Sequence, residues 1–323
     1  MKQGLFTTAL FMATIGLHAQ TDFQAGLNKI SFKSDGFKLI GHIYLPPSFV
    51  QSGSYTAVVI DGPQSSVKEQ VAANYASHLA EAGFVVLAFD HQGYGESEGF
   101  PRQDEVPQKK VRDIQNAVSY LISLPFVDSN KIGAIGICSG GGYSARAVAG
   151  DPRVKAFVGI AGFYHNPAVM VQWLGEDGYK TLLNRAISSR QNYRQTGEVE
   201  YMVNVSDKGG DLAMPGQEAF DYYGTKRSYS PGWVNRSTTM SFEHFLQFNA
   251  IDAAQELSVP TLIIHSDNAL VPEEGAKTFY RNLKGKKDLY WMSSINHIAF
   301  YDQADLVKEA AVKTIEWFEK NLR

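Results

Sequence analysis

Short apolar runs alternate with longer amphipathic segments along most of this chain. The apolar runs have the length of buried strands and lie at residues 56–60, 84–89, 131–137, 154–160, 261–265 and 289–292. Apolar residues three and four positions apart predict helices at residues 66–82, 110–124 and 303–322. Two further runs, 30–33 and 37–44, flank Ser34-Asp35-Gly36 and are typical of an opening hairpin. Such alternation favours a mainly parallel sheet with helices on both faces.

A stretch between about residues 163 and 250 breaks this alternation. It is rich in Tyr, Trp, Met, Asn and Gly, which predicts a helical cap inserted into one domain of residues 20–323. The cap is the part of the chain best suited to select a substrate. Its aromatic side chains could line a pocket or pack a small core of their own, and they are Trp173, Tyr179, Tyr193, Tyr201, Tyr222, Tyr223 and Trp233.

The first twenty residues have the layout of a secretory signal peptide. Lys2 precedes an apolar run from Leu5 to Leu17, and the small residue Ala19 follows it. The run is shorter than the roughly 20 residues that a membrane-spanning helix needs, and no later stretch approaches that length. We therefore expect cleavage of residues 1–19, a periplasmic or secreted protein, and no integral membrane segment after cleavage.

The composition argues against a nucleic-acid partner and against a metal or another cofactor. It also shows one unusual residue, a single cysteine. With 30 Lys and Arg against 33 Asp and Glu, the formal net charge is −3, so nucleic acid is not an expected partner. The chain has one Cys and no His-x-x-x-His spacing, so neither a metal nor another cofactor is expected. That Cys, Cys138, has no second Cys for an internal disulfide. In an exported protein it is either buried and inert or retained for its reactivity.

Cys138 lies at the centre of a motif that predicts a nucleophile. The sequence KIGAIGICSGGGYSARA places Gly136 and Gly140 on either side of it, between an apolar strand and a helix of small residues. This spacing suits a sharp, strained turn, where flanking glycines let the strand and the helix approach closely. The helix N-terminus is expected to lower the pKa of Cys138, and the N–H of Ser139 points to where an oxyanion would form.

Other interpretations of this glycine-rich turn fit less well. The Ser139 hydroxyl is the rival nucleophile, but it follows the apex of the turn and is expected to point away from the site. A phosphate-binding loop would need the spacing GxGxxG or a P-loop Lys, and GICSGGGYS has neither. The remaining alternative is that Cys138 has only a structural role and takes no part in catalysis.

Five segments together carry a resemblance to a known superfamily. They are Lys68-Glu69, the sequence FDHQGYGESEGFPR at 89–102, the turn around Cys138, HSDNALVPE at 265–273 and NHIAFYD at 296–302. The chain resembles the α/β-hydrolases, and within them the dienelactone hydrolases and relatives that carry Gly-x-Cys-x-Gly-Gly. The resemblance implies an α/β-hydrolase fold and hydrolysis of an ester, lactone or thioester of a small molecule by a nucleophile, a His and an acid.

The same resemblance implies which residues assist Cys138. The family places its His after the last strand, where this chain has His297. The acid follows the strand at 261–265, and Asp267 is the only carboxylate in the short loop predicted there. Another register would put Asn268 in that position, and Asp302 is the fallback.

The second oxyanion donor is expected in the loop after residue 60. Pro63 has no N–H to donate, so the backbone amide of Gln64 is the candidate. A Cys-His-Asp hydrolase that forms an acyl-enzyme is then the first hypothesis. The alternatives are an acyltransferase or a peptidase on the same fold, and a non-catalytic binding protein on a hydrolase scaffold. The oligomeric state is left open.

Overall fold

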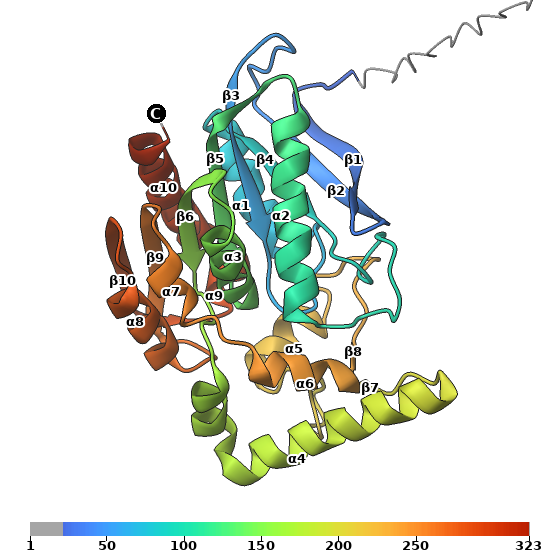
Figure 1. Ribbon diagram of the computed structural model, residues 1–323. Coiled ribbons are helices and arrows are strands. Elements are labelled where there is room, and N and C mark those ends of the chain that lie inside the picture. The colour runs from blue at the N-terminus through green and yellow to red at the C-terminus, as the bar shows by residue number, and fades with distance from the viewer. Residues whose placement is uncertain (1–21, 323) are drawn as a thin grey trace, which may run out of the picture.

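The computed structural model describes residues 22–322, so the predicted signal peptide at 1–19 lies outside the described residues. Eight strands form one sheet in the order β1-β2-β4-β3-β5-β6-β9-β10 (Figure 1). Their bounds are β1 Gly26–Ser34, β2 Phe37–Leu45, β3 Tyr55–Asp61, β4 Val85–Phe89, β5 Val127–Ile137, β6 Val154–Ile160, β9 Thr261–Asn268 and β10 Lys287–Asn296. The predicted hairpin is confirmed as β1 and β2, and from β4 to β10 all neighbours are parallel.

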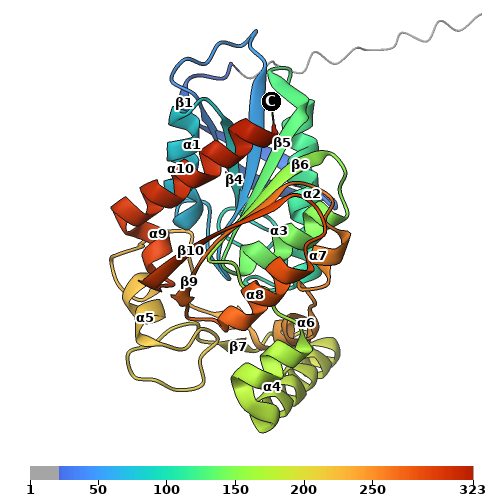
Figure 2. The same ribbon diagram turned by 90° about the vertical axis from the view of Figure 1, so that its left-hand side faces the viewer.

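Helices cover both faces of the sheet, so its central strands are buried on both sides (Figures 1 and 2). The helices outside the cap are α1 Val71–Glu81, α2 Pro107–Ser123, α3 Ser139–Ala149, α7 Ala253–Glu256, α8 Glu273–Asn282, α9 Ala299–Asp302 and α10 Ala304–Asn321. Along β3, Ala57 and Val59 belong to one apolar core, while Val58 and Ile60 belong to the other. The continuous apolar runs of the sequence are therefore strands buried on both faces.

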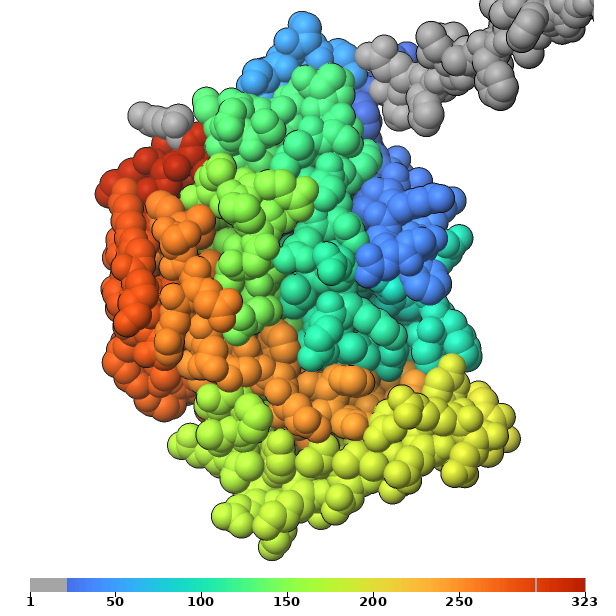
Figure 3. Space-filling view, in the orientation of Figure 1, coloured from blue at the N-terminus to red at the C-terminus, as the bar shows by residue number. Residues whose placement is uncertain are grey.

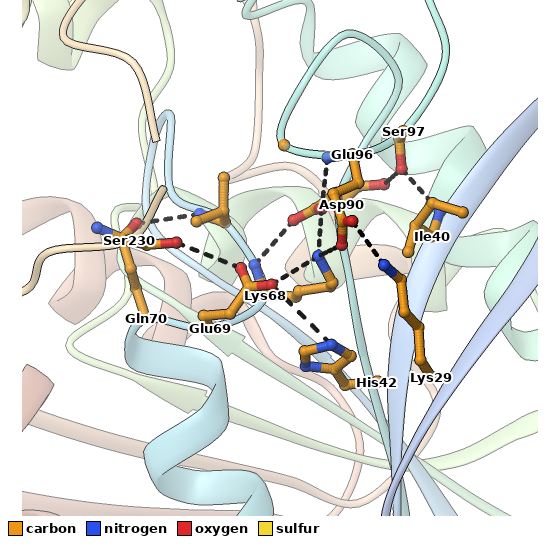
Figure 4. A network of polar contacts seen from close by, with 12 residues as sticks. Lys29, Ile40, His42, Lys68, Glu69, Gln70, Asp90, Glu96, Ser97 and Ser230 are labelled. Atoms are coloured by element: carbon orange, nitrogen blue, oxygen red, sulfur yellow. Dashed lines mark hydrogen bonds and ion pairs between the residues drawn. The ribbon is translucent and has the colours of Figure 1, made fainter. Parts of the chain in front are cut away.

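Helix α1 begins five residues later than predicted because the preceding residues form turns around a buried cation. The N–H of Gln70 bonds to the carbonyl of Val67, which closes a turn just before the helix. The turn carries Lys68, whose ammonium lies 2.8 Å from Asp90, 2.7 Å from Glu69 and 2.9 Å from Glu96 (Figure 4). This ion cluster fixes the loop after β4 against the start of α1.

The segment between β6 and β9 adds elements on one side of the sheet, at the lower end of the molecule in Figures 1 and 3. Its elements are α4 Pro167–Thr196, β7 Tyr201–Met202, α5 Gln217–Tyr223, β8 Ser237–Thr238, a 3-10 helix at Thr239–Ser241 and α6 Phe242–Gln247. Helix α4 breaks at Gly175, whose φ of 74° is non-helical. Among residues 22–322, no helix has both the length and the apolar character to span a membrane.

Candidate active site

The turn from β5 into α3 has the strained geometry that the sequence motif predicts. Cys138 has φ 55° and ψ −124°, a conformation that L-residues rarely adopt. A Cβ on Gly136 would collide with the carbonyl of Gly140, and a Cβ on Gly140 would lie 2.5 Å from the carbonyl oxygen of Gly62. Glycine is therefore required on both sides of Cys138, which is held at the carboxyl end of β5.

Four polar groups act on the partly buried Cys138 sulfur and lower its pKa. They are the backbone N–H of Ser139, the backbone N–H of Gln64, the hydroxyl of Tyr301 and the hydroxyl of Ser139, which lies 3.9 Å away. The structure thus brings the two oxyanion donors predicted from the sequence to the same atom. An oxygen anion formed by attack of this sulfur on a carbonyl would develop within reach of both amides.

The thiol of Cys138 is less acidic than the sequence suggests. Burial raises its pKa above the ordinary value, and the four polar groups that act on the sulfur oppose this only in part. The N–H of Ser139 at the helix N-terminus lowers the pKa of Cys138 as expected, but burial outweighs this contribution. A neutral thiol needs a base to remove its proton before it can attack.

The loop that carries Gln64 is anchored to a buried carboxylate. The N–H of Ser65 donates to Glu105 at 3.2 Å, and Ser65 itself has a φ of 59°. Glu105 also accepts from the hydroxyls of Tyr94 at 2.6 Å and Tyr143 at 3.0 Å, and it pairs with the Lys110 ammonium at 2.8 Å. These contacts hold the loop in the conformation that directs the Gln64 amide at the sulfur.

His297 is buried directly after β10, with Tyr301 between it and the pocket that Cys138 lines. Its Nε2 lies 3.0 Å from the Tyr301 hydroxyl, and its Nδ1 has no hydrogen-bond partner in the described part of the chain. Burial, with a smaller contribution from His265, lowers the pKa of His297 to about 3. The imidazole is therefore neutral at physiological pH and has the charge state of a base.

The structure does not join Asp267 to His297. Strand β9 runs three residues further than predicted, because Asn268 still pairs with Asn296 of β10. Asp267 and Asn268 consequently lie in an exposed strand end and not in a tight loop. Asp302, the fallback, has both carboxylate oxygens 2.6 Å from the Arg227 guanidinium. The hydrogen bond expected between an acid and His297 is thus absent within residues 22–322.

A largely apolar pocket of about 370 Å³ lies against Cys138. The cap supplies much of its wall, including Met170, Leu182, Phe242 and Phe245. Of the seven cap aromatics singled out in the sequence, Trp173 and Tyr223 line this pocket. The other lining residues are Pro63, Gln64, Ser139, Phe163, Leu174, Leu212, Ala213, Met214, Pro215, Ala219, Leu270, Val271, Ile298 and Tyr301. No Asp, Glu, Lys or Arg occurs among the described residues that line it.

A second buried network lies at the end of β3, behind the loop of Gln64. His91 is held between Asp61, at 2.8 Å, and Asp113, at 3.1 Å. Burial alone would lower the pKa of His91, but the two carboxylates outweigh it and raise the pKa to about 9. His91 is thus a cation that fixes the end of β3, and it does not line the pocket.

This ion network predicts a specific loss of stability at alkaline pH. The folded pKa of His91 lies above the unfolded value of 6.5. Its contribution to the free energy of unfolding is therefore complete below pH 6.5 and is lost as the pH rises through about 9. We expect this contribution to be of the order of 1–3 kcal/mol. It can be measured by urea unfolding at pH 6, 7.5 and 9.5 for wild type and His91→Gln.

His91→Gln should remove this part of the pH dependence. His78→Gln, a change on α1 outside this network, serves as the control. An equal alkaline loss in wild type and His91→Gln would contradict the assignment.

The fold and the nucleophile turn define this protein as an α/β-hydrolase. Residues 66–304 match the family Hydrolase_4, described as "Serine aminopeptidase, S33", and the chain belongs to that family. The fold expected from the sequence is confirmed. The family description names a serine enzyme, whereas the apex of the turn here is Cys138.

Several proteins are similar to this chain in sequence or in structure. The uncharacterized protein YcjY of Escherichia coli K12 is 32% identical over 91% of this chain and 99% of its own length. Thiohydrolase aneE of Aspergillus aculeatus is 28% identical over 81% of this chain and 83% of its own. The crystal structure of the hypothetical protein PA2218 from Pseudomonas aeruginosa has a TM-score of 0.83 at 30% identity, and it covers 99% of this chain and 100% of its own. The chain is accordingly an α/β-hydrolase enzyme.

Proposed function

We propose that this enzyme hydrolyses an ester, lactone or thioester of an apolar acyl group through Cys138. The observation that carries the proposal is the position of the Cys138 sulfur, at the apolar pocket and within reach of the amides of Ser139 and Gln64. The sulfur gives its proton to the base and attacks the carbonyl, and the two amides stabilise the oxyanion. The alcohol or thiol then leaves with that proton, and water cleaves the acyl-enzyme to the free acid and the Cys138 thiol. His297 is the proposed base, and Asp267 is the proposed acid, although its carboxylate does not reach His297 in this structure.

The lining of the pocket favours binding of an uncharged acyl group, which we propose is the part of the substrate that the enzyme recognises. Aliphatic, aromatic and Met side chains line most of it, and no charged side chain of residues 22–322 does. Burial of apolar surface contributes about 25 cal/mol per Å², so chain length should raise affinity until the pocket is full. The printed name of the relative aneE, a thiohydrolase, supports a thioester as one leaving-group class.

An aminopeptidase activity is less well supported by this pocket. An aminopeptidase must bind the ammonium group at the start of its substrate, and a buried cation needs a carboxylate or several carbonyls as partners. The described lining of the pocket includes neither Asp nor Glu. The peptidase named in the family description is therefore not the activity that we propose for this chain.

Acyl transfer is the second candidate. A relative from Penicillium crustosum, 25% identical over 78% of this chain and 84% of its own length, has the printed name polyketide transferase claH. A pocket with so few polar groups restricts water, so an acyl-enzyme could persist until an alcohol or thiol replaces water as the acceptor. Addition of acceptor alcohols to the assay, with product analysis by mass spectrometry, separates transfer from hydrolysis.

We expect the enzyme to cleave activated acyl compounds faster than amides. A thiolate is a better leaving group than an unprotonated amine, so the tetrahedral intermediate of an amide returns to the thiol. For one acyl group, such as octanoyl, kcat/KM should be at least about 100-fold higher for the thioester and the ester than for the amide. A series of acyl lengths in the same assay tests the pocket. Faster cleavage of the amide would contradict the proposal and indicate a peptidase.

We also propose that the protein is exported to the periplasm or secreted, as the layout of residues 1–19 predicts. Mass spectrometry of the protein from a cell fractionation would test this. An intact Met1 on cytoplasmic protein would contradict it.

A further inference from the structure

Cys138 and His297 are joined in this structure through a third side chain. The Tyr301 hydroxyl lies 3.0 Å from Nε2 of His297, and it also acts on the sulfur of Cys138, whose pKa it lowers. Tyr301 lines the apolar pocket together with Cys138, whereas His297 is fully buried behind it. One hydroxyl therefore interacts with both the atom that must lose a proton and the atom that must accept it.

The position of Tyr301 is fixed by the packing of α9 on the core. The backbone carbonyl of Tyr301 accepts a hydrogen bond from Asn74 at 2.7 Å, and that of Phe300 accepts one from the Tyr75 hydroxyl at 2.7 Å. The Tyr301 ring meets the ring of Tyr222 edge to face, with centroids 5.2 Å apart. The backbone and the ring of Tyr301 are thus both held in place.

We propose that Tyr301 is a catalytic residue that relays the proton of Cys138 to His297. The S–H proton passes to the Tyr301 oxygen while the Tyr301 O–H proton passes to Nε2 of His297. The result is a thiolate, an imidazolium and an unchanged tyrosine. The two transfers are concerted, because burial makes a free tyrosinate costly. This inference rests on the proposed role of Cys138 as the nucleophile.

His297 is the proton acceptor available to the relay. His297 is neutral, so Nε2 can accept a proton when Nδ1 carries the hydrogen. The titratable groups that face Tyr301 are Cys138, His297, Tyr222 and Tyr223, and burial raises the pKa of both of these neighbouring tyrosines. His297 is the only one of these four that is a base at neutral pH. The proton therefore has a single acceptor among these described residues.

The test uses the reaction of Cys138 with iodoacetamide, which needs no substrate. Because the chain has a single Cys, the rate of alkylation between pH 5 and 10 reports the thiolate of Cys138 alone. Tyr301→Phe keeps the ring and removes the hydroxyl. We expect its alkylation profile to move to higher pH by about one unit, since the thiolate loses a hydrogen bond. kcat/KM should fall about 100-fold, as for loss of general-base assistance.

Two further variants make the result specific. Tyr164→Phe removes a buried hydroxyl that has no hydrogen-bond partner in the described structure and lies outside the pocket lining, so its profile should match wild type. The double variant Tyr301→Phe/His297→Gln should be no slower than His297→Gln alone, because the relay has no function without its acceptor. Full additivity of the two losses would overturn the relay.

The outcomes separate this inference from the proposed function. If Cys138→Ala is inactive while Tyr301→Phe has the wild-type alkylation profile and turnover, the relay is wrong and the nucleophile stands. If Cys138→Ala remains active, the proposed function itself is wrong. Should Tyr301→Phe be poorly folded by circular dichroism, 3-fluorotyrosine at position 301 keeps the hydroxyl and lowers its pKa. The relay then predicts a shifted profile, and an unchanged profile would overturn it.

Discussion

Replacement of Cys138 by alanine is expected to abolish turnover, with a loss of at least about 10⁴-fold in kcat. The reason is that the sulfur forms the covalent intermediate in the proposed mechanism, and no other group within residues 22–322 occupies the apex of the turn. The fold should be retained, because alanine keeps the Cβ of Cys138 and removes only the sulfur, which is partly buried at the pocket. Steady-state kinetics on a thioester and thermal melting of the same preparations measure both effects.

Ser139→Ala is the matched comparison for this variant. The Ser139 hydroxyl lies 3.9 Å from the Cys138 sulfur, and only the backbone N–H of Ser139 has a role in the proposed chemistry. We expect Ser139→Ala to retain activity within about tenfold of wild type, since it loses one weak contact. An active Cys138→Ala together with an inactive Ser139→Ala would show that the serine is the nucleophile.

Replacement of His297 by glutamine is expected to lower kcat by about 10³-fold or more. The thiol of Cys138 is neutral at rest because burial raises its pKa, so attack requires a base. His297 is the proposed base, and it would act on the sulfur through the Tyr301 hydroxyl, which lies 3.0 Å from its Nε2. The loss should shrink as the pH rises, because hydroxide then forms the thiolate without the imidazole. Profiles of kcat/KM against pH for wild type and variant measure this convergence.

A surface histidine provides the control for the loss of an imidazole. His244 is exposed on α6, and His244→Gln should have the activity of wild type. Equal losses in the two variants, or a His297→Gln loss that persists unchanged at pH 10, would contradict the role of His297 as the base.

The strands and the nucleophile turn could be predicted from the sequence because their signals are local. Apolar runs such as 154–160 must be buried on both faces wherever helices alternate with strands, and β6 has these bounds. Glycine at positions 136 and 140 is a local steric requirement of the turn at Cys138, and the structure has the expected strained φ there. The backbone amides of Ser139 and Gln64 follow from the same turn and from the neighbouring strand end.

Other features depend on groups that are distant in the sequence, and only the tertiary structure determined them. Pairing with β10 extends β9 through Asn268, so Asp267 lies in a strand end. The burial that raises the pKa of Cys138 comes from the whole fold. Tyr301 follows His297 by one helical turn, which signals that the two side chains can meet. Its contact with Cys138, more than 160 residues earlier, arises because α9 packs on α1 beside the carboxyl end of β5. Local periodicity carries no information on such long-range packing, and this packing sets the charge states and the hydrogen bonds of the site.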